Sequence, residues 1–271
     1  MLQVINDEDA TVAAAVRAEL SAIAHAVDAL VERIAAGGRV FYIGAGTSGR
    51  LGVLDASECP PTFSVPPTLF QGIIAGGEAA LRRSSEGSED SPEIGARDLA
   101  QAGFASEDAL VGIAASGRTP YVLGAMSHAK VAGALVLSLT CVANSPMAQI
   151  ADIAIAPLTG PEILTGSTRM KAGTATKLVL TMLSTGVMIR SGATYGNLMV
   201  NVQPTNAKLL DRARRIIMAA THCDEHSATH LLEIAGDVKT AIVMQQLSVD
   251  LKTAQAKLTA AHGSLRAALI A

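Results

Sequence analysis

The sequence contains no tryptophan, and aromatic residues make up only 3% of its 271 residues. Proteins that bind single strands of nucleic acid without sequence preference stack bases on aromatic side chains, so the composition disfavours this class. Basic residues do not dominate either, because 21 Lys and Arg stand against 24 Asp and Glu, for a net charge of −3. A weakly acidic chain lacks the positive charge typical of DNA- and RNA-binding proteins, and we expect no nucleic-acid partner.

Cysteine and long hydrophobic runs are also scarce. The three cysteines, Cys59, Cys141 and Cys223, are an odd number without a Cys-x-x-Cys pair. This pattern argues against a disulfide framework and favours a reducing compartment. The first nine residues have no basic segment, so no secretory signal is expected, and apolar runs are interrupted before they reach membrane-spanning length. The sequence therefore predicts a cytoplasmic protein without membrane contact.

Hydrophobic residues are abundant at 49%, against 17% charged residues, which excludes disorder for most of the chain. Short apolar segments alternate with helical patterns along the first half of the sequence. Strands are predicted at residues 39–43, 70–75, 109–114, 134–139 and 151–155. This alternation is typical of a parallel sheet covered by helices on both faces, so the sequence predicts a doubly wound α/β fold.

Helical periodicity fills much of the remaining sequence. Apolar residues recur every three or four positions from residue 9 to residue 35, which predicts one amphipathic helix. A long apolar helix with small side chains is expected at residues 166–190, buried on all sides and packed against a second subunit. Further helices are predicted at residues 78–101 with a break near Ser91, 120–131, 206–219, 226–235 and 247–261. The expected organisation is a sheet domain over residues 1–205 and a small helical domain over residues 206–271.

Two loops of similar composition follow predicted strands and precede predicted helices. Both contain the tripeptide Ser-Gly-Arg, at Ser48-Gly49-Arg50 and Ser116-Gly117-Arg118. Such loops lie at the carboxyl edge of a parallel sheet, where small residues, hydroxyl groups and helix N-termini can bind an anion. Although one such loop is more often an ordinary capped turn, two matched loops favour a phosphate site. The candidate binding residues are Gly46, Thr47, Ser48, Gly49, Ser116, Gly117, Arg118 and Thr119.

The first loop also matches the glycine spacing of dinucleotide-binding folds, Gly44-x-Gly46-x-x-Gly49. That interpretation needs an acidic residue about 20 positions further on to bind the ribose. No Asp or Glu occurs from Cys59 to Gly77, and neither loop continues into the Gly-Lys-Ser/Thr of a nucleoside-triphosphate site. We therefore expect no nicotinamide or nucleotide cofactor.

Longer segments resemble one known family. The run from Gly44 to Gly52, followed by Asp55-Ala56-Ser57-Glu58-Cys59-Pro60-Pro61-Thr62, is similar to a motif of the N-acetylmuramic acid 6-phosphate etherases. Residues 113–121 and 165–174, then Asn197-Leu198-Met199-Val200 and Asn206, continue the similarity in the same order. Members of the family have further residues before the segment 5–9, and if these help to close the site or the dimer, we expect this form to be less active.

The resemblance implies a sugar isomerase (SIS) domain, an αβα sandwich with a five-stranded parallel sheet, followed by a small C-terminal helical domain. It also implies a homodimer, a sugar-phosphate substrate, and neither metal nor organic cofactor. The implied reaction cleaves the lactyl ether of N-acetylmuramic acid 6-phosphate to N-acetylglucosamine 6-phosphate and D-lactate, in the recycling of bacterial cell-wall sugars. The alternative is a non-catalytic sugar-phosphate-binding regulator, because the related glucokinase regulatory protein uses the same architecture for binding.

The resemblance also assigns two catalytic carboxyl groups, Glu58 and Glu89. An elimination at the sugar needs one group to take a proton from C2 and another to protonate the leaving oxygen. Glu58 lies in otherwise uncharged sequence beside Cys59, where we expect burial to keep it protonated as the acid. Cys59 itself has no histidine near it in the sequence and is expected to pack. Glu89 is then the base, although the residues alone do not distinguish it from Glu86 or Asp90.

Other candidate groups have simpler explanations. Three histidines are spaced so that they could share one helical face: His222, His226 and His230. Such a face can bind zinc, but a surface face without metal is favoured, and no metal site is expected. Arg169 and Lys171 could neutralise a substrate anion, or they could pair with Glu162, and the sequence leaves this choice open.

Overall fold

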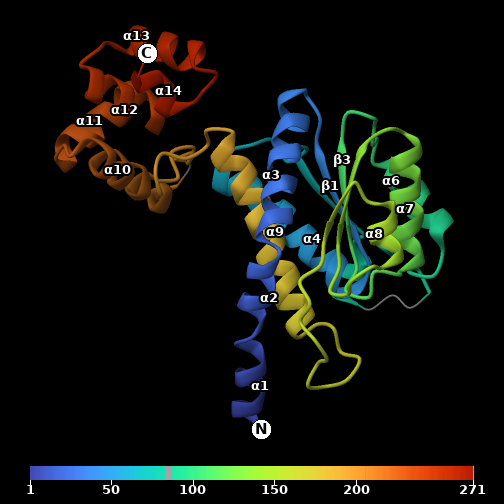
Figure 1. Ribbon diagram of the computed structural model, residues 1–271. Helices are drawn as coiled ribbons and strands as arrows, with labels where there is room; N and C mark the ends of the chain where they lie inside the picture. The colour runs from blue at the N-terminus through green and yellow to red at the C-terminus, as the bar shows by residue number, and fades with distance from the viewer. Residues whose placement is uncertain (84–86, 205, 271) are drawn as a thin grey trace. The chain divides into compact units, whose positions relative to one another are not determined.

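The structure of the protein is a computed structural model that describes residues 1–83, 87–204 and 206–270 (Figure 1). The chain folds into two compact units. The first unit consists of Met1–Ser57 and Pro67–Val187, and the second of Glu58–Pro66 and Met188–Ala271. The second unit therefore begins before residue 205, where the sequence predicted the boundary, and it includes the end of a helix that starts in the first unit.

The first unit is built on a five-stranded parallel sheet with the strand order β2-β1-β3-β4-β5 (Figure 1). The strands are β1 (Val40–Gly44), β2 (Phe70–Ile74), β3 (Ala109–Ile113), β4 (Leu135–Leu139) and β5 (Ile153–Ile155). Each strand lies within one residue of its predicted range or inside it, which confirms the parallel α/β sheet. Every residue of the central strands β1 and β3 is buried, which explains why both are nearly continuous apolar runs.

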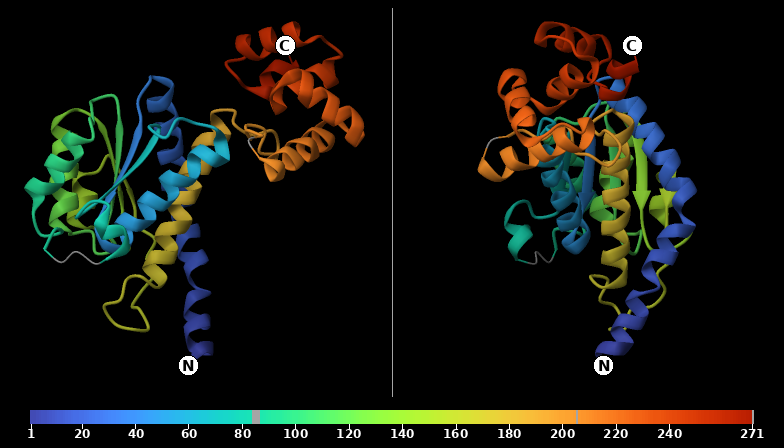
Figure 2. Two further views of the ribbon diagram at one scale, coloured as in Figure 1. Left: turned by 180° about the vertical axis from the view of Figure 1, so that it is seen from behind. Right: turned by 90° about the vertical axis from the view of Figure 1, so that its left-hand side faces the viewer.

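Helices cover both faces of the sheet (Figures 1 and 2). One face carries α6 (Pro92–Gln101), α7 (Pro120–Val131) and α8 (Pro146–Ile150), and the other carries α3 (Leu20–Ala35), α4 (Gly46–Phe63) and α9 (Lys171–Arg190). Phe41 and Ile43 of β1 pack on the first face with Leu99 of α6. On the second face, a Cβ added to Gly52 of α4 would lie 3.0 Å from the Cβ of Tyr42. The missing side chain thus lets α4 lie directly on the sheet.

The N-terminal segment forms three helices, α1 (Leu2–Asp9), α2 (Val12–Ala18) and α3, so the prediction of one helix over residues 9–35 is wrong. The axis bends by 57° between Leu2–Ala18 and Leu20–Ala35. At the bend, the Glu19 carboxylate accepts a hydrogen bond of 2.9 Å from the backbone N–H of Ala156, directly after β5. The apolar spacing conceals this break because Val16 and Ile23, on either side of Glu19, are both buried.

Helix α9 begins at Lys171 rather than at the predicted residue 166. The Glu162 carboxylate accepts hydrogen bonds from the backbone N–H groups of Lys171 and Ala172, at 2.9 and 3.0 Å. These bonds satisfy two of the donors that a helix leaves unpaired at its start. The tertiary position of Glu162, which periodicity does not reveal, therefore sets the first residue of the helix.

Within the part of the chain that the structure describes, α9 is the one helix long and apolar enough to cross a membrane. The N-terminal helices qualify only if their bent pair counts as a single span. No apolar run of that length was expected from the sequence. Of the most apolar 18 residues of α9, 56% is buried inside the protein, as in a core helix. Met182 is nevertheless 39% exposed and Ile189 51% exposed, so the expected burial on all sides is wrong for the single chain.

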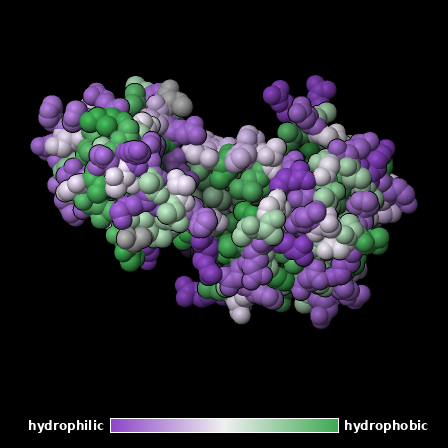
Figure 3. All heavy atoms as spheres, turned by 90° about the horizontal axis from the view of Figure 1, so that it is seen from above, coloured by the Kyte–Doolittle hydropathy of each residue, from purple (hydrophilic) through white to green (hydrophobic). Residues whose placement is uncertain are grey.

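The second unit contains a bundle of short helices after residue 205. They are α10 (Ala207–Thr221), α11 (Glu225–Ala235), α12 (Val238–Leu247), α13 (Leu251–Ala260) and α14 (Leu265–Ile270). Four of them begin at Asn or Asp caps that accept the N–H of the third residue further on: Asn206, Asp224, Asp237 and Asp250. The helical C-terminal region is confirmed, although α12 and α14 were not predicted. Both hydrophobic and hydrophilic residues appear on the face of this unit seen in Figure 3.

Candidate functional site

The first Ser-Gly-Arg loop is a tight connection in which α4 begins two residues after β1 ends. A Cβ on Gly49 would lie 2.6 Å from the backbone oxygen of Gly44, and a Cβ on Gly44 would lie 2.7 Å from the nitrogen of Gly49. Only glycine at both positions permits this approach. The N–H of Gly49 bonds to Ala45, but those of Gly46, Thr47 and Ser48 meet no acceptor among the described residues. Three donors at a helix N-terminus are therefore available to an anion.

The second loop, residues 114–119, is held in place from the neighbouring loop after β4. Gly117 has a φ of +63°, and a Cβ there would lie 2.3 Å from the Cβ of Ser145. Its carbonyl accepts the N–H of Met147 at 3.1 Å. The N–H groups of Ser116, Arg118 and Thr119 have no acceptor in the described parts of the chain. Thr119 is the N-cap of α7 but makes no side-chain capping bond, so its hydroxyl is free for a ligand.

The two loops leave the same edge of the sheet from adjacent strands. β1 and β3 are hydrogen-bonded neighbours, with Gly44 opposite Ile113. The helices that follow these strands, α4 and α7, cover opposite faces (Figure 1). This arrangement is the switch point at which doubly wound sheets bind ligands. The structure thus brings together the two loops that the sequence singled out.

The two arginines of the matched tripeptides have different environments. Arg50 donates to the backbone oxygens of Ala80 and Leu81, at 2.7 and 3.1 Å, and so holds the short helix α5 (Ala79–Arg82) against α4. The Arg118 side chain is exposed and makes no hydrogen bond or ion pair with any residue that the structure describes. Arg118 is therefore available to a ligand, whereas Arg50 supports the structure.

Glu89 lies on the segment between α5 and α6, and this segment is tied to the second loop. The backbone oxygen of Glu89 accepts the N–H of Tyr121, in the first turn of α7, at 3.0 Å. The side chains of Glu89 and Asp90 are both exposed, and Glu86 lies outside the described residues. The hydrogen bond from α7 therefore anchors the backbone of this acidic segment beside the second loop.

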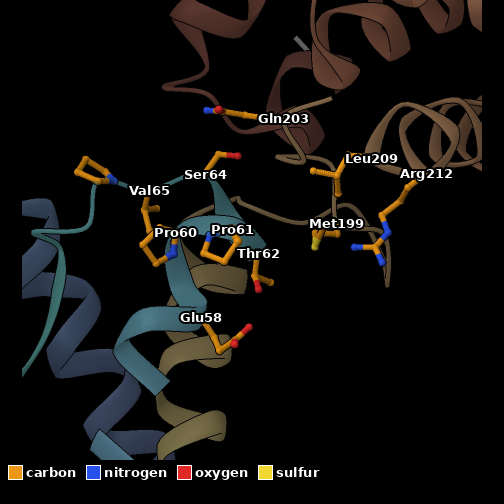
Figure 4. Close-up of a pocket in the computed structure, with 11 residues that line it drawn as sticks. Glu58, Pro60, Pro61, Thr62, Ser64, Val65, Met199, Gln203, Leu209 and Arg212 are labelled. Carbon is orange, nitrogen blue, oxygen red and sulfur yellow. The ribbon is translucent and has the colours of Figure 1, made fainter. Parts of the chain in front are cut away.

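Glu58 lies on α4, in the part of this helix that belongs to the second unit. Its side chain is exposed, so the expected burial of this carboxyl group is wrong for the single chain. It lines a cavity of about 580 Å³ within the second unit (Figure 4). The neighbouring Cys59 is buried, as predicted for a packing residue. Glu58 thus projects from α4 into a space that can receive a ligand.

Asp55, one turn before Glu58 on α4, is an acidic residue that was not predicted as a candidate. Its Oδ1 accepts a hydrogen bond from Ser184 of α9 at 3.2 Å. Burial raises the pKa of Asp55, while hydrogen bonds from Ser184 and Tyr42 and the charge of Lys177 act in the opposite direction. The residue joins α4 to β1 and α9 and so fixes the helix on which Glu58 lies. An acidic residue between the apolar residues Leu54 and Ala56 was the signal that could have identified it.

The remaining candidates have structural explanations. His222 adopts a left-handed conformation at the end of α10, and the other two histidines lie on α11, so the predicted common helical face is wrong. No group of three or more His, Cys, Asp or Glu side chains in the described residues could hold a metal ion. The Nζ atom of Lys171 pairs with Glu8 at 2.6 Å, while Glu162 caps the backbone of α9. Lys171 is therefore committed to α1 rather than to a substrate anion.

Comparison with known proteins places this fold. Residues 22–130 match the glucokinase regulatory protein N-terminal SIS domain, and residues 91–186 match the SIS domain. A phosphoheptose isomerase from Francisella tularensis has a similar structure, with a TM-score of 0.53 and 21% sequence identity. The match covers 69% of this chain and 98% of that one. These similarities confirm the predicted SIS fold.

Sequence relatives are much closer than these structures. The N-acetylmuramic acid 6-phosphate etherase of Photorhabdus laumondii is 55% identical over 267 residues, which cover 98% of this chain and 89% of the relative. That of Aliivibrio salmonicida is 56% identical over 270 residues, which cover 99% of this chain and 90% of the relative. Identity at this level extends well beyond the loops and the segment around Glu58. The chain belongs to the family of N-acetylmuramic acid 6-phosphate etherases.

Proposed function

We propose that the protein is a cytoplasmic lyase that cleaves the D-lactyl ether of N-acetylmuramic acid 6-phosphate, in the recycling of cell-wall sugars. The products are N-acetylglucosamine 6-phosphate and D-lactate. The observation that carries the proposal is the pair of loops at one sheet edge. Six of their N–H groups, which have no acceptor among the described residues, suit the phosphate of this substrate. The two relatives described above are named for the same etherase activity.

The chemistry of the substrate dictates an indirect route. An ether at C3 of a sugar is a poor target for direct hydrolysis, but ring opening creates an aldehyde at C1 that acidifies the proton on C2. A base removes this proton, a double bond forms between C2 and C3, and the C3–O bond breaks to release lactate. Water then adds its oxygen to C3 and a proton returns to C2. The net reaction consumes one water and needs only acid–base groups, so we propose no metal or organic cofactor.

We assign the two proton transfers to the two glutamates. Glu89 takes the proton from C2, because its backbone is hydrogen-bonded to the first turn of α7, directly after the second loop proposed to bind the phosphate. Glu58 protonates the leaving ether oxygen, because it projects into a cavity that can receive the departing group. An acid and a base on different elements can each be tuned by its own surroundings.

The phosphate-binding assignment predicts the effect of Ser116→Ala. The hydroxyl is exposed in the second loop and would donate to a phosphate oxygen. Losing one hydrogen bond to a charged group costs ~1.5–3 kcal/mol, so the Kd for the sugar phosphate should rise roughly 10- to 100-fold. Titration calorimetry with N-acetylglucosamine 6-phosphate measures this change. Ser106→Ala, at an exposed serine before β3, is the matched control, and an unchanged Kd for Ser116→Ala would overturn the assignment.

A non-catalytic regulator is the second candidate function, because residues 22–130 match the glucokinase regulatory protein domain. An assay for D-lactate after addition of N-acetylmuramic acid 6-phosphate separates the two candidates. The etherase releases one lactate for each substrate consumed. Tight sugar-phosphate binding without lactate would instead support the regulator.

We further propose that the protein is a homodimer with its active site near the subunit boundary. Helix α1 has no buried residue in the single chain, and Leu54 of α4 is 49% exposed. The partly exposed apolar residues of α9 add to this surface. Light scattering at micromolar concentration should give twice the mass of one chain, since burial of apolar surface drives association. A mass equal to that of one chain would contradict the proposal.

A further inference from the structure

The cavity beside Glu58 has both apolar and polar lining residues. Three prolines, Val65, Met199 and Leu209 line it. Its two main walls are joined by hydrogen bonds, because the Asn201 side chain donates to the backbone oxygen of Phe63 at 2.9 Å and Ser64 donates to the backbone oxygen of Asn201. The cavity is therefore a built feature of the second unit.

One cation lines this cavity, Arg212 of α10. The other two arginines of the same helix are engaged elsewhere: Arg215 pairs with Asp211 at 2.9 Å, and Arg214 lies 3.6 Å from the same carboxylate. Arg212 makes no hydrogen bond or ion pair with any residue in the described ranges. A guanidinium group at an apolar wall, with its five donors unused by the protein, is suited to a planar anion.

Figure 4 shows how Arg212 and Glu58 are arranged. The two side chains enter the cavity from different elements, and Thr62 and Met199 lie between them in that view. A ligand that contacts both must therefore carry a group for the carboxyl side chain and an anion for the guanidinium.

We propose that Arg212 binds the carboxylate of the lactyl group, which makes the cavity the recognition site for the leaving group. The inference rests on the proposed function, in which Glu58 protonates the ether oxygen at C3. In the substrate, the carboxyl carbon of the lactyl group is separated from that oxygen by a single carbon atom. A lactyl group whose ether oxygen contacts Glu58 therefore places its carboxylate within the same cavity, which Arg212 also lines. Guanidinium groups bind carboxylates through two parallel hydrogen bonds, and the apolar wall accepts the lactyl methyl.

This role would distinguish the substrate from its sugar product. N-Acetylglucosamine 6-phosphate has a hydroxyl at C3 and no carboxylate, so it gains nothing from Arg212. Arg212 is thus a specificity residue for the lactyl ether, distinct from the loops that bind the phosphate.

The test compares Arg212→Gln with Arg215→Gln on the same helix. Arg215 is exposed, pairs with Asp211 and does not line the cavity, so its variant is a matched loss of one surface charge. For lactate release from N-acetylmuramic acid 6-phosphate, kcat/KM of Arg212→Gln should fall roughly 10- to 100-fold, chiefly through a higher KM. The Arg215→Gln variant should retain the wild-type value. Circular dichroism and thermal melting establish that both variants are folded.

A substrate analogue and the product identify the group that Arg212 binds. Wild-type enzyme should lose a similar factor with an analogue whose lactyl carboxylate is a neutral carboxamide, and Arg212→Gln should lose little more with it. The C2 proton of N-acetylglucosamine 6-phosphate should exchange with D₂O equally fast in both proteins, because addition of water at C3 is reversible and this sugar lacks the lactyl group.

The outcomes separate the two levels of the proposal. If wild-type protein releases no lactate, the proposed function fails and the inference fails with it. If wild-type protein releases lactate but Arg212→Gln matches it, only the inference is overturned. If Arg212→Gln lost lactate release and C2 proton exchange of the sugar product by the same factor, the inference would also be overturned. That result would mean that Arg212 binds the sugar or its phosphate.

Discussion

Glu58→Gln is expected to lose lactate release while the C2 proton of the substrate continues to exchange with D₂O. Glutamine fills the same space in the cavity but cannot protonate the ether oxygen. Removal of the C2 proton needs only the base and the C1 aldehyde, so that step remains. General acids contribute ~10²–10⁴-fold to rate, and the fall in lactate release should lie in this range. Proton NMR of the C2 signal and an enzymatic lactate assay follow the two steps in one sample.

The side chain of Glu58 is exposed to solvent in the single chain. A general acid is most effective when water is kept away from the proton it donates. Bound substrate and, in the proposed dimer, a second subunit would supply that exclusion. Glu58→Ala should behave like Glu58→Gln. If both variants released lactate at the wild-type rate, Glu58 would not be the acid.

Glu89→Gln is expected to lose both lactate release and C2 proton exchange, by a similar factor of ~10²–10⁴. Without the base no proton leaves C2, so neither the exchange nor the elimination that follows can proceed. The same NMR and lactate assays measure the effect. Asp90→Asn is the matched control, because Asp90 is an exposed acidic neighbour. It removes one negative charge from the same segment and should leave both activities near the wild-type level.

A different division of roles would give a different pattern. If one carboxylate both removed the C2 proton and protonated the leaving oxygen on the same face, the Glu89 variant would still exchange the C2 proton. Glu58 would then carry both steps, and its own variant would lose the exchange. Because each variant is assayed for both C2 exchange and lactate release, the two measurements show which glutamate carries which step.

The sheet was predictable because each strand is a short apolar run between helical patterns. The helix boundaries that depend on tertiary contacts were not predictable from the sequence. The break at Glu19 is held by the N–H of Ala156, which lies far away in the sequence, and the start of α9 is set by Glu162. Helix α12 begins at the cap Asp237 and buries four consecutive residues, 240–243, so it lacks the apolar spacing of three or four residues that predicts an amphipathic helix.

The phosphate-binding loops of the candidate site were predictable, because the spacing of their glycines reflects the geometry of the backbone. The close approach of Gly44 and Gly49 requires the motif that the sequence displays. By contrast, the different roles of Arg50 and Arg118 follow from acceptors on α5, which no local pattern reveals. That Arg212 has no partner among the described residues became apparent only once the ion pairs of α10 were known.

The most direct test of the central claim is the reaction of N-acetylmuramic acid 6-phosphate with the enzyme in H₂¹⁸O, followed by mass spectrometry of both products. Elimination breaks the bond between C3 and the ether oxygen, and water then adds to C3. The sugar product should therefore carry one ¹⁸O at C3, and the hydroxyl of D-lactate should retain the original ¹⁶O. Label in the lactate hydroxyl with an unlabelled sugar would show cleavage on the other side of the ether oxygen and would contradict the mechanism.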